Sequence, residues 1–129
     1  MKLSPTQQKA LAEAAEVLVR EHAAEWARQH LSQLSFTVRS TRRGLFLILR
    51  ALALNPKRLA SARILTSPPR DASSWSRLRS QMLQRGLSNL PDAKHRYVFV
   101  PASAAPRARR EFTATTVHVV PLNSVARGV

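Results

Sequence analysis

The stretch that decides the fold is Ser35-Phe-Thr-Val-Arg-Ser-Thr-Arg-Arg-Gly-Leu-Phe-Leu-Ile-Leu-Arg-Ala-Leu-Ala-Leu54. Its first six residues alternate between polar and apolar and are rich in β-formers, which predicts a half-buried strand over 35–40. Residues 41–44 have the composition of a turn, because Gly44 can adopt a positive φ at little steric cost. The apolar run over 45–53 is then predicted to return as a second, buried strand.

A helix over 42–54 is the competing interpretation, because leucine and alanine favour helices and Asn55-Pro56 is a good helix stop. Turn signals bracket each apolar segment, however, which favours strands. Asn55-Pro56-Lys57-Arg58 is the second turn, and residues 60–67, with Arg63-Ile-Leu-Thr66, are predicted to form the third strand. We therefore predict an antiparallel meander of three strands.

One helix is predicted before this meander in the sequence, and another is predicted after it. Residues 4–33 form the first, because Ser4 and Gln7 match a capping box and Pro5 suits the first helical position. Its apolar stripe has helical spacing and consists of Leu11, Ala15, Leu18, His22 and Trp26. A second helix is predicted over 73–86, capped by Ser73 or Ser74 and ended by Gly86. Its stripe consists of Trp75, Leu78 and Met82.

The remaining segments predict two more strands. Residues 96–100 and 116–120 are short apolar runs bounded by breakers, with Pro121 closing the second, and 106–114 fits a short helix between them. Two strands joined by a helix are typical of a right-handed βαβ crossover.

We therefore expect an α/β (α+β) fold with a long N-terminal helix, a three-strand antiparallel meander and then helix-strand-helix-strand. A single mixed sheet would be flanked by helices. One domain is expected over 1–122, with a neutral helix at 1–34 and a basic body at 35–122, followed by a flexible tail at 123–129.

The net charge of +14 arises entirely after residue 34. Residues 1–34 hold four basic and four acidic side chains, whereas residues 35–129 hold seventeen basic side chains and three acids. Most of these cations are arginines, whose planar fork of donors matches phosphate groups. A field this strong and this localised indicates a polyanionic partner, and nucleic acid is the expected one.

Other function classes are disfavoured by composition. The chain has no cysteine, which excludes disulfides, thiolate metal sites and cysteine nucleophiles. The longest apolar run, 45–54, contains Arg50 and is about half the length that spans a bilayer. The first helix is interrupted by glutamates and is no secretory signal. We expect an intracellular, cytoplasmic protein without membrane association, associated with the nucleoid if its partner is DNA.

The order of predicted elements resembles that of the restriction-endonuclease-like, or PD-(D/E)xK, fold. Residues 62–66, followed by the helix from Ser74, resemble its third strand and next helix. The runs Tyr97-Val-Phe-Val100, Pro106-Arg-Ala-Arg-Arg-Glu-Phe112 and Val117-His-Val-Val120 resemble the closing strand-helix-strand of Mrr-type members. The resemblance implies an acid near the second strand and an acid-x-lysine on the third, which hold Mg²⁺. Residues 35–70 contain no Asp or Glu, so we expect a nuclease-like module without catalysis, metal or cofactor.

Arginines are the candidate contacts with nucleic acid, and duplex DNA is favoured over RNA because few aromatic residues are available for stacking on single strands. One group surrounds the two predicted turns, a second shares the polar face of the second helix, and a third begins the third helix, where a bound anion would complement the helix dipole. The predicted contacts are Arg39, Arg42, Arg43, Lys57, Arg58, Arg77, Gln81, Arg85, Arg107, Arg109 and Arg110.

Two other functions compete with nucleic-acid binding. A basic interaction protein could dock on an acidic protein, as an inhibitor or as a subunit of a nucleoprotein complex, and the first helix could mediate such contacts or self-association. A metal-free ribonuclease would need His95 or His118 beside a second general acid or base. His22 is interpreted as a core histidine, because it shares the stripe of the first helix.

Overall fold

In the part of the chain that the structure describes, five strands form one mixed sheet in the order β1-β2-β3-β4-β5, and three α-helices flank it. The computed structural model describes residues 3–28, 33–42, 44–52, 57–83 and 95–125. The helices are α1 (Pro5–Arg28), α2 (Ala72–Leu83) and α3 (Ala105–Glu111). The strands are β1 (Gln33–Thr41), β2 (Gly44–Leu52), β3 (Lys57–Ile64), β4 (His95–Pro101) and β5 (Val117–Leu122). The predicted fold class, including the single mixed sheet flanked by helices, is confirmed.

Strands β1, β2 and β3 form the predicted antiparallel meander. Thr41 pairs with Gly44 across the first turn, and Gly44 adopts the expected positive φ of 140°. The competing helix over 42–54 is wrong for 44–52, because the run is buried from both sides and a strand buries both faces at once. The third strand begins earlier than predicted, so Lys57 and Arg58 belong to β3 instead of a turn.

The second half of the sheet is parallel. Strand β4 pairs with β3 on one side and with β5 on the other, both in parallel register, and α3 connects β4 to β5. Strand β5 continues through Pro121, which the sequence predicted to close it. Proline is tolerated there because β5 is an edge strand and needs ladder bonds on one side only.

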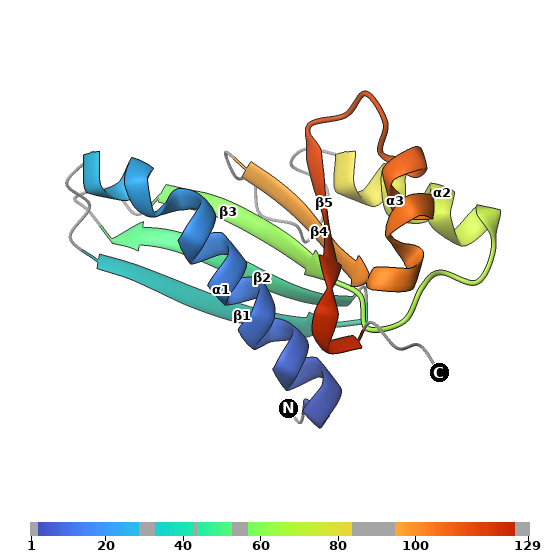
Figure 1. Ribbon diagram of the computed structural model, residues 1–129, viewed down its shortest axis with the longest axis horizontal. Coiled ribbons are helices and arrows are strands. Elements are labelled where there is room, and N and C mark those ends of the chain that lie inside the picture. The colour runs from blue at the N-terminus through green and yellow to red at the C-terminus, as the bar shows by residue number, and fades with distance from the viewer. Residues whose placement is uncertain (1–2, 29–32, 43, 53–56, 84–94, 126–129) are drawn as a thin grey trace.

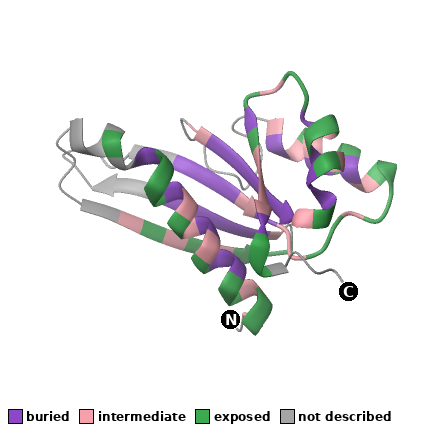
Figure 2. Cartoon of the chain, viewed as in Figure 1, coloured by how far each residue is buried: buried purple, intermediate pink, exposed green. Residues whose placement is uncertain are grey.

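The sheet separates two apolar cores, which gives three layers (Figure 1). Helix α1 crosses one face, where Leu18 packs with Leu47 of β2 and Phe99 of β4. Helices α2 and α3 cover the other face, where Trp75 and Phe112 pack with side chains that include Phe46. Figure 2 shows the central strands buried between helices whose outer sides are exposed.

Local capping explains where the helices begin. Ser4 and Gln7 form the predicted capping box, with the Gln7 backbone N–H donating to Ser4 Oγ at 3.1 Å and the Ser4 N–H donating to Gln7 Oε1 at 2.9 Å. The N-cap of α2 is Asp71, whose carboxylate accepts the Ser74 backbone N–H at 2.8 Å, so the predicted caps Ser73 and Ser74 are wrong. A carboxylate one residue before the helix satisfies the third N–H, which a serine inside the helix cannot do.

The helices end at other residues than the sequence predicted. Helix α1 ends at Arg28, and β1 already begins at Gln33, so the helix predicted to reach residue 33 is shorter. Helix α2 ends at Leu83, and the predicted stop at Gly86 lies outside the described residues. Arg96, on β4, donates from Nη1 to the Met82 carbonyl at 2.8 Å and so satisfies an acceptor in the last turn of α2.

The beginning of the predicted flexible tail is attached to α1. Residues 123–125 form a short 3₁₀ helix, and the backbone N–H groups of Asn123 and Ser124 donate to the Glu13 carboxylate at 2.7 and 2.8 Å. Residues 126–129 lie outside the described part of the chain. Partial burial raises the pKa of Glu13, but these backbone hydrogen bonds outweigh it and hold the pKa below its ordinary value.

Glu13→Gln is expected to lower the free energy of unfolding at pH 7 by roughly 0.5–1 kcal/mol, because an exposed charge-assisted contact is weakened. Since the folded pKa is depressed, this contribution is present above the unfolded pKa of the carboxyl and is lost as the pH falls through the folded pKa. Urea denaturation across pH should therefore show the two proteins converging in acid. A difference that persists unchanged in acid would contradict the assignment.

Candidate nucleic-acid interface

Arginines from three separate elements meet in one surface pocket with a volume of about 340 Å³. Arg42 comes from the turn after β1, Arg63 from the end of β3 and Arg77 from α2. The remaining polar lining consists of Ser67, Ser74 and Gln81. The apolar lining consists of Leu65, Pro68, Pro69 and Leu78. The pocket lies on the face of the sheet opposite α1, because Arg63 shares that face with Phe46.

The sequence builds this pocket through the segment that joins β3 to α2. Strand β3 ends at Ile64, and the Leu65 backbone N–H still donates to the Phe99 carbonyl at 2.8 Å, which keeps the segment on the sheet. Pro68-Pro69 then turns the chain away from the sheet, and Asp71 starts α2. Arg77 and Gln81 are one helical turn apart, so they point toward the same side.

Arg63 is the most constrained side chain of the pocket. Its guanidinium carbon lies 5.1 Å from the centre of the Phe46 ring, a residue with which Arg63 is paired across β2 and β3. Its Nε is buried and has no hydrogen-bond partner within the described residues. Burial lowers the pKa of the guanidinium below its usual value, so the charge is held where desolvation disfavours it. Because Arg63 lines the pocket, its charge lies beside a space that an anion from outside can occupy.

Gly44 provides the space for this guanidinium. A Cβ atom placed on Gly44 would overlap the guanidinium carbon of Arg63, so any side chain at this position displaces Arg63. Gly44 lies on the same face as Phe46, two residues along β2. The glycine therefore serves two purposes: it adopts the positive φ of the turn, and it leaves room above Phe46 for Arg63.

Two further groups lie close to the pocket. Arg39 of β1 is paired with Phe46 of β2, and Arg63 of β3 is paired with the same residue. Arginines of the two strands next to β2 therefore flank Phe46. Asp71, whose side chain is exposed, is stabilised as an anion by hydrogen bonds from the backbone N–H and the hydroxyl of Ser74. These bonds lower its pKa, and the charge of Arg77 contributes a smaller part.

The predicted cluster on α3 is arranged differently from the expectation. Arg109 and Arg110 occupy the last turn of α3, where the helix dipole favours cations, so only Arg107 lies near the N-terminus, where a bound anion was expected. Both side chains are exposed. Arg107 has structural contacts: its guanidinium carbon lies 5.6 Å from the centre of the Trp75 ring, and its Nη2 lies 3.3 Å from Glu111 Oε1.

The structure thus brings together only some of the predicted contacts. Arg42, Arg77 and Gln81 line the pocket, and Arg39 lies next to it in the sheet. Lys57 and Arg58 begin β3, at the opposite end of that strand from Arg63. Arg43 and Arg85 lie outside the described residues. Arg63 itself was not predicted as a contact, because its position next to Gly44 and Phe46 follows from the strand register.

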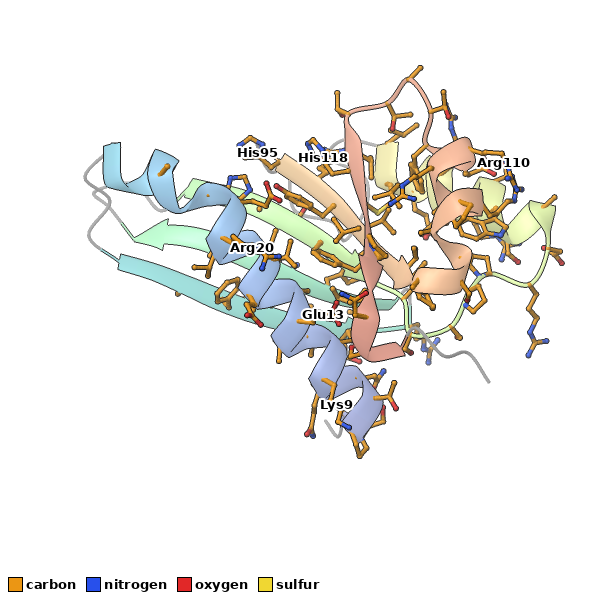
Figure 3. All side chains as sticks on the ribbon, in the orientation of Figure 1. Lys9, Glu13, Arg20, His95, Arg110 and His118 are labelled. Atoms are coloured by element: carbon orange, nitrogen blue, oxygen red, sulfur yellow. The ribbon has the colours of Figure 1, made fainter. Side chains whose placement is uncertain are left out.

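Histidines gather on the other face of the sheet. His22 Nε2 and Tyr97 Oη are 2.6 Å apart, and the ring of His22 lies 4.5 Å from that of His95. The ring of His118, on β5, lies 5.1 Å from that of Tyr97, and Figure 3 shows His95 and His118 near the starts of β4 and β5. The expected burial of His22 is confirmed.

A second pocket, of about 540 Å³, lies between α1 and β5 and has a different character. Three glutamates of α1 and Arg20 line it together with Val120 and Pro121. These glutamates are Glu13, Glu16 and Glu21. The acidic side of the molecule is therefore opposite the arginine pocket.

Among the described residues, no group of three or more His, Asp or Glu side chains is placed to hold a metal ion. Within the same residues, no helix has the length and apolar character needed to cross a bilayer. Comparison with protein-family models, curated proteins and solved structures finds no match for the chain.

Gly44→Ala is expected to lower the free energy of unfolding by about 1–2 kcal/mol, because a side chain is strained at this φ. It should also move Arg63 off Phe46, since the new Cβ occupies its place. Urea denaturation of the single variants Gly44→Ala and Arg63→Met and of the double variant tests this. We expect the double variant to lose less than the sum of the singles; strict additivity would contradict the contact.

Tyr97→Phe is expected to lower the free energy of unfolding by about 1–2 kcal/mol, because the hydroxyl bound to buried His22 is removed. Thr116→Ala is the control, since its exposed side chain should contribute within about 0.5 kcal/mol. Chemical denaturation compares the two variants. Equal stability of Tyr97→Phe and the native chain would show that the hydrogen bond contributes little.

Proposed function

We propose that this chain is a non-catalytic nucleic-acid-binding protein, with duplex DNA as the favoured partner. The observation that carries the proposal is the convergence of Arg42, Arg63 and Arg77 from three separate elements on one pocket. Scattered surface arginines would indicate solubility alone. Three arginines that line one pocket repel one another, and a negatively charged ligand bound there would offset that repulsion.

The surroundings of the pocket support a polymer as the ligand. Arg39 flanks the pocket through β1, and the exposed Arg109 and Arg110 extend positive charge over α3 on the same face of the sheet (Figure 3 labels Arg110). Phosphate contacts distributed over several elements are typical of proteins that follow a nucleic-acid backbone. Gln81, next to Arg77 in the pocket, adds an amide of the kind that pairs with adenine.

The proposal includes a nuclease-like origin. The order of elements, α1, β1 to β3, α2, β4, α3, β5, is the order on which the resemblance to PD-(D/E)xK nucleases rests. That resemblance puts an acid-x-lysine on the third strand, and here the third strand carries Arg63. A guanidinium binds phosphate but not Mg²⁺, so the exchange retains affinity for the backbone without the metal needed for cleavage.

Binding should be measured with labelled duplex DNA, single-stranded DNA and RNA of one sequence, across a salt series with Mg²⁺ present. The logarithm of the affinity should fall with the logarithm of salt, by about 0.9 per phosphate neutralised. Replacing Arg42 and Arg77 by alanine should weaken binding about ten- to hundredfold and reduce that slope by about two. The matched control replaces Lys9 and Arg20, two exposed cations of α1, and should change affinity less than about threefold.

Each contrary result has a definite meaning. Equal losses in the two double variants would show that net charge, not the pocket, governs binding. Cleavage of any substrate would contradict the non-catalytic assignment. Absence of salt-sensitive binding, together with a stoichiometric protein complex that resists nuclease, would favour the alternative of a basic protein that docks on an acidic partner.

A further inference from the structure

We infer that the pocket around Arg63 recognises a phosphate monoester, the group found at the end of a nucleic-acid strand, in preference to an internal phosphodiester. The assignment of this group to the end of a nucleic-acid strand rests on the proposed function. The chemistry itself rests on the pocket, and a free nucleotide offers the same group. The charge, the preorganisation and the shape of the pocket each favour a monoester.

The charge of the pocket matches a dianion. Arg42, Arg63 and Arg77 supply three positive charges, and no carboxylate is among the residues that line the pocket. A phosphodiester carries a single negative charge, whereas a phosphate monoester carries between one and a half and two at neutral pH. Asp71, directly before α2, carries a carboxylate that is already engaged as the helix cap by Ser74.

Arg63 is preorganised to donate to such a group. Its guanidinium is fixed against the Phe46 ring and above Gly44, so binding loses little side-chain freedom. Its Nε is buried without a partner within the described residues, and the residue lines the pocket, where the planar guanidinium offers the fork of donors that binds two oxygens of one phosphate. Because Arg63 is half-buried, its attraction to an anion is screened less than that of an exposed arginine.

The shape of the site suits the end of a strand. The ligand space is a pocket of about 340 Å³, a size typical of small-molecule sites, bounded by the first turn, the end of β3 and α2. The Ser67 hydroxyl adds a neutral donor beside the arginines, whereas the Ser74 hydroxyl is engaged with Asp71. Leu65 and Leu78, with the two prolines, form an apolar wall against which the sugar and base of a terminal nucleotide can pack.

The experiment compares three oligonucleotides of one sequence, with an internal label and a 5′-phosphate, a 3′-phosphate or hydroxyls at both ends. At fixed salt, we expect the native protein to bind one phosphorylated form about tenfold more tightly than the hydroxyl form. Arg63→Met should remove this ratio and keep most of the binding to the hydroxyl form. The control replacing Lys9 and Arg20 should keep the ratio, and thermal unfolding should verify that each variant is folded.

A second measurement follows the Arg63 Nε–H signal by NMR, identified by its loss in Arg63→Met. A nucleoside 5′-monophosphate should shift this signal, whereas dimethyl phosphate, a diester, should shift it at least about tenfold less at equal concentration. Arg63→Lys keeps the charge without the fork, so it should bind the monophosphate more weakly than the native protein.

The two proposals fail in different ways. Equal affinity for all three oligonucleotides, with salt-sensitive binding retained, overturns the monoester site and leaves nucleic-acid binding intact. A shift with the monophosphate alone, without binding of any oligonucleotide, supports the monoester site with a free nucleotide as its source and overturns nucleic-acid binding. Equal shifts with both probes, or no shift with either, overturn the monoester site.

Discussion

The structure depends on the need to cover both faces of β2. Residues 45–49 are all buried, and their side chains alternate between the two sides of the sheet. Leu47 and Leu49 pack under α1, whereas Phe46 packs in the core formed with α2 and α3. A strand that is apolar on both faces cannot lie at a solvated surface, so the three-layer arrangement follows from this one segment.

The candidate site arises where this coverage ends. Phe46 lies at the start of β2, and the guanidinium of Arg63 completes the cover over its ring. The aromatic ring and the arginine thus have linked roles, since burying the ring also orients the charge. This arrangement connects the fold to the proposed function, because the same contact that closes the core prepares a donor for an anion.

The two sides of the sheet have different electrostatic characters. Helix α1 presents glutamates beside β5, and the opposite face carries the arginine pocket and the exposed arginines of α3. The separation keeps acidic side chains away from the proposed ligand site, so they do not neutralise its field. Among the described residues, the exceptions are Asp71, which caps α2, and Glu111, which pairs with Arg107.

The sequence by itself determined the element order, the capping box of α1, the turn at Gly44 and the meander, because these depend on local propensity and on periodicity. It also located the positive charge after residue 34. The helix ends differed from the sequence predictions, and so did the N-cap of α2, which is Asp71. Neighbouring residues compete for the same N–H groups. Only the tertiary structure decided which arginines lie together: Arg63 joins Arg42 and Arg77 in one pocket because strand register puts it over Gly44 and Phe46, and register is fixed by packing between distant segments.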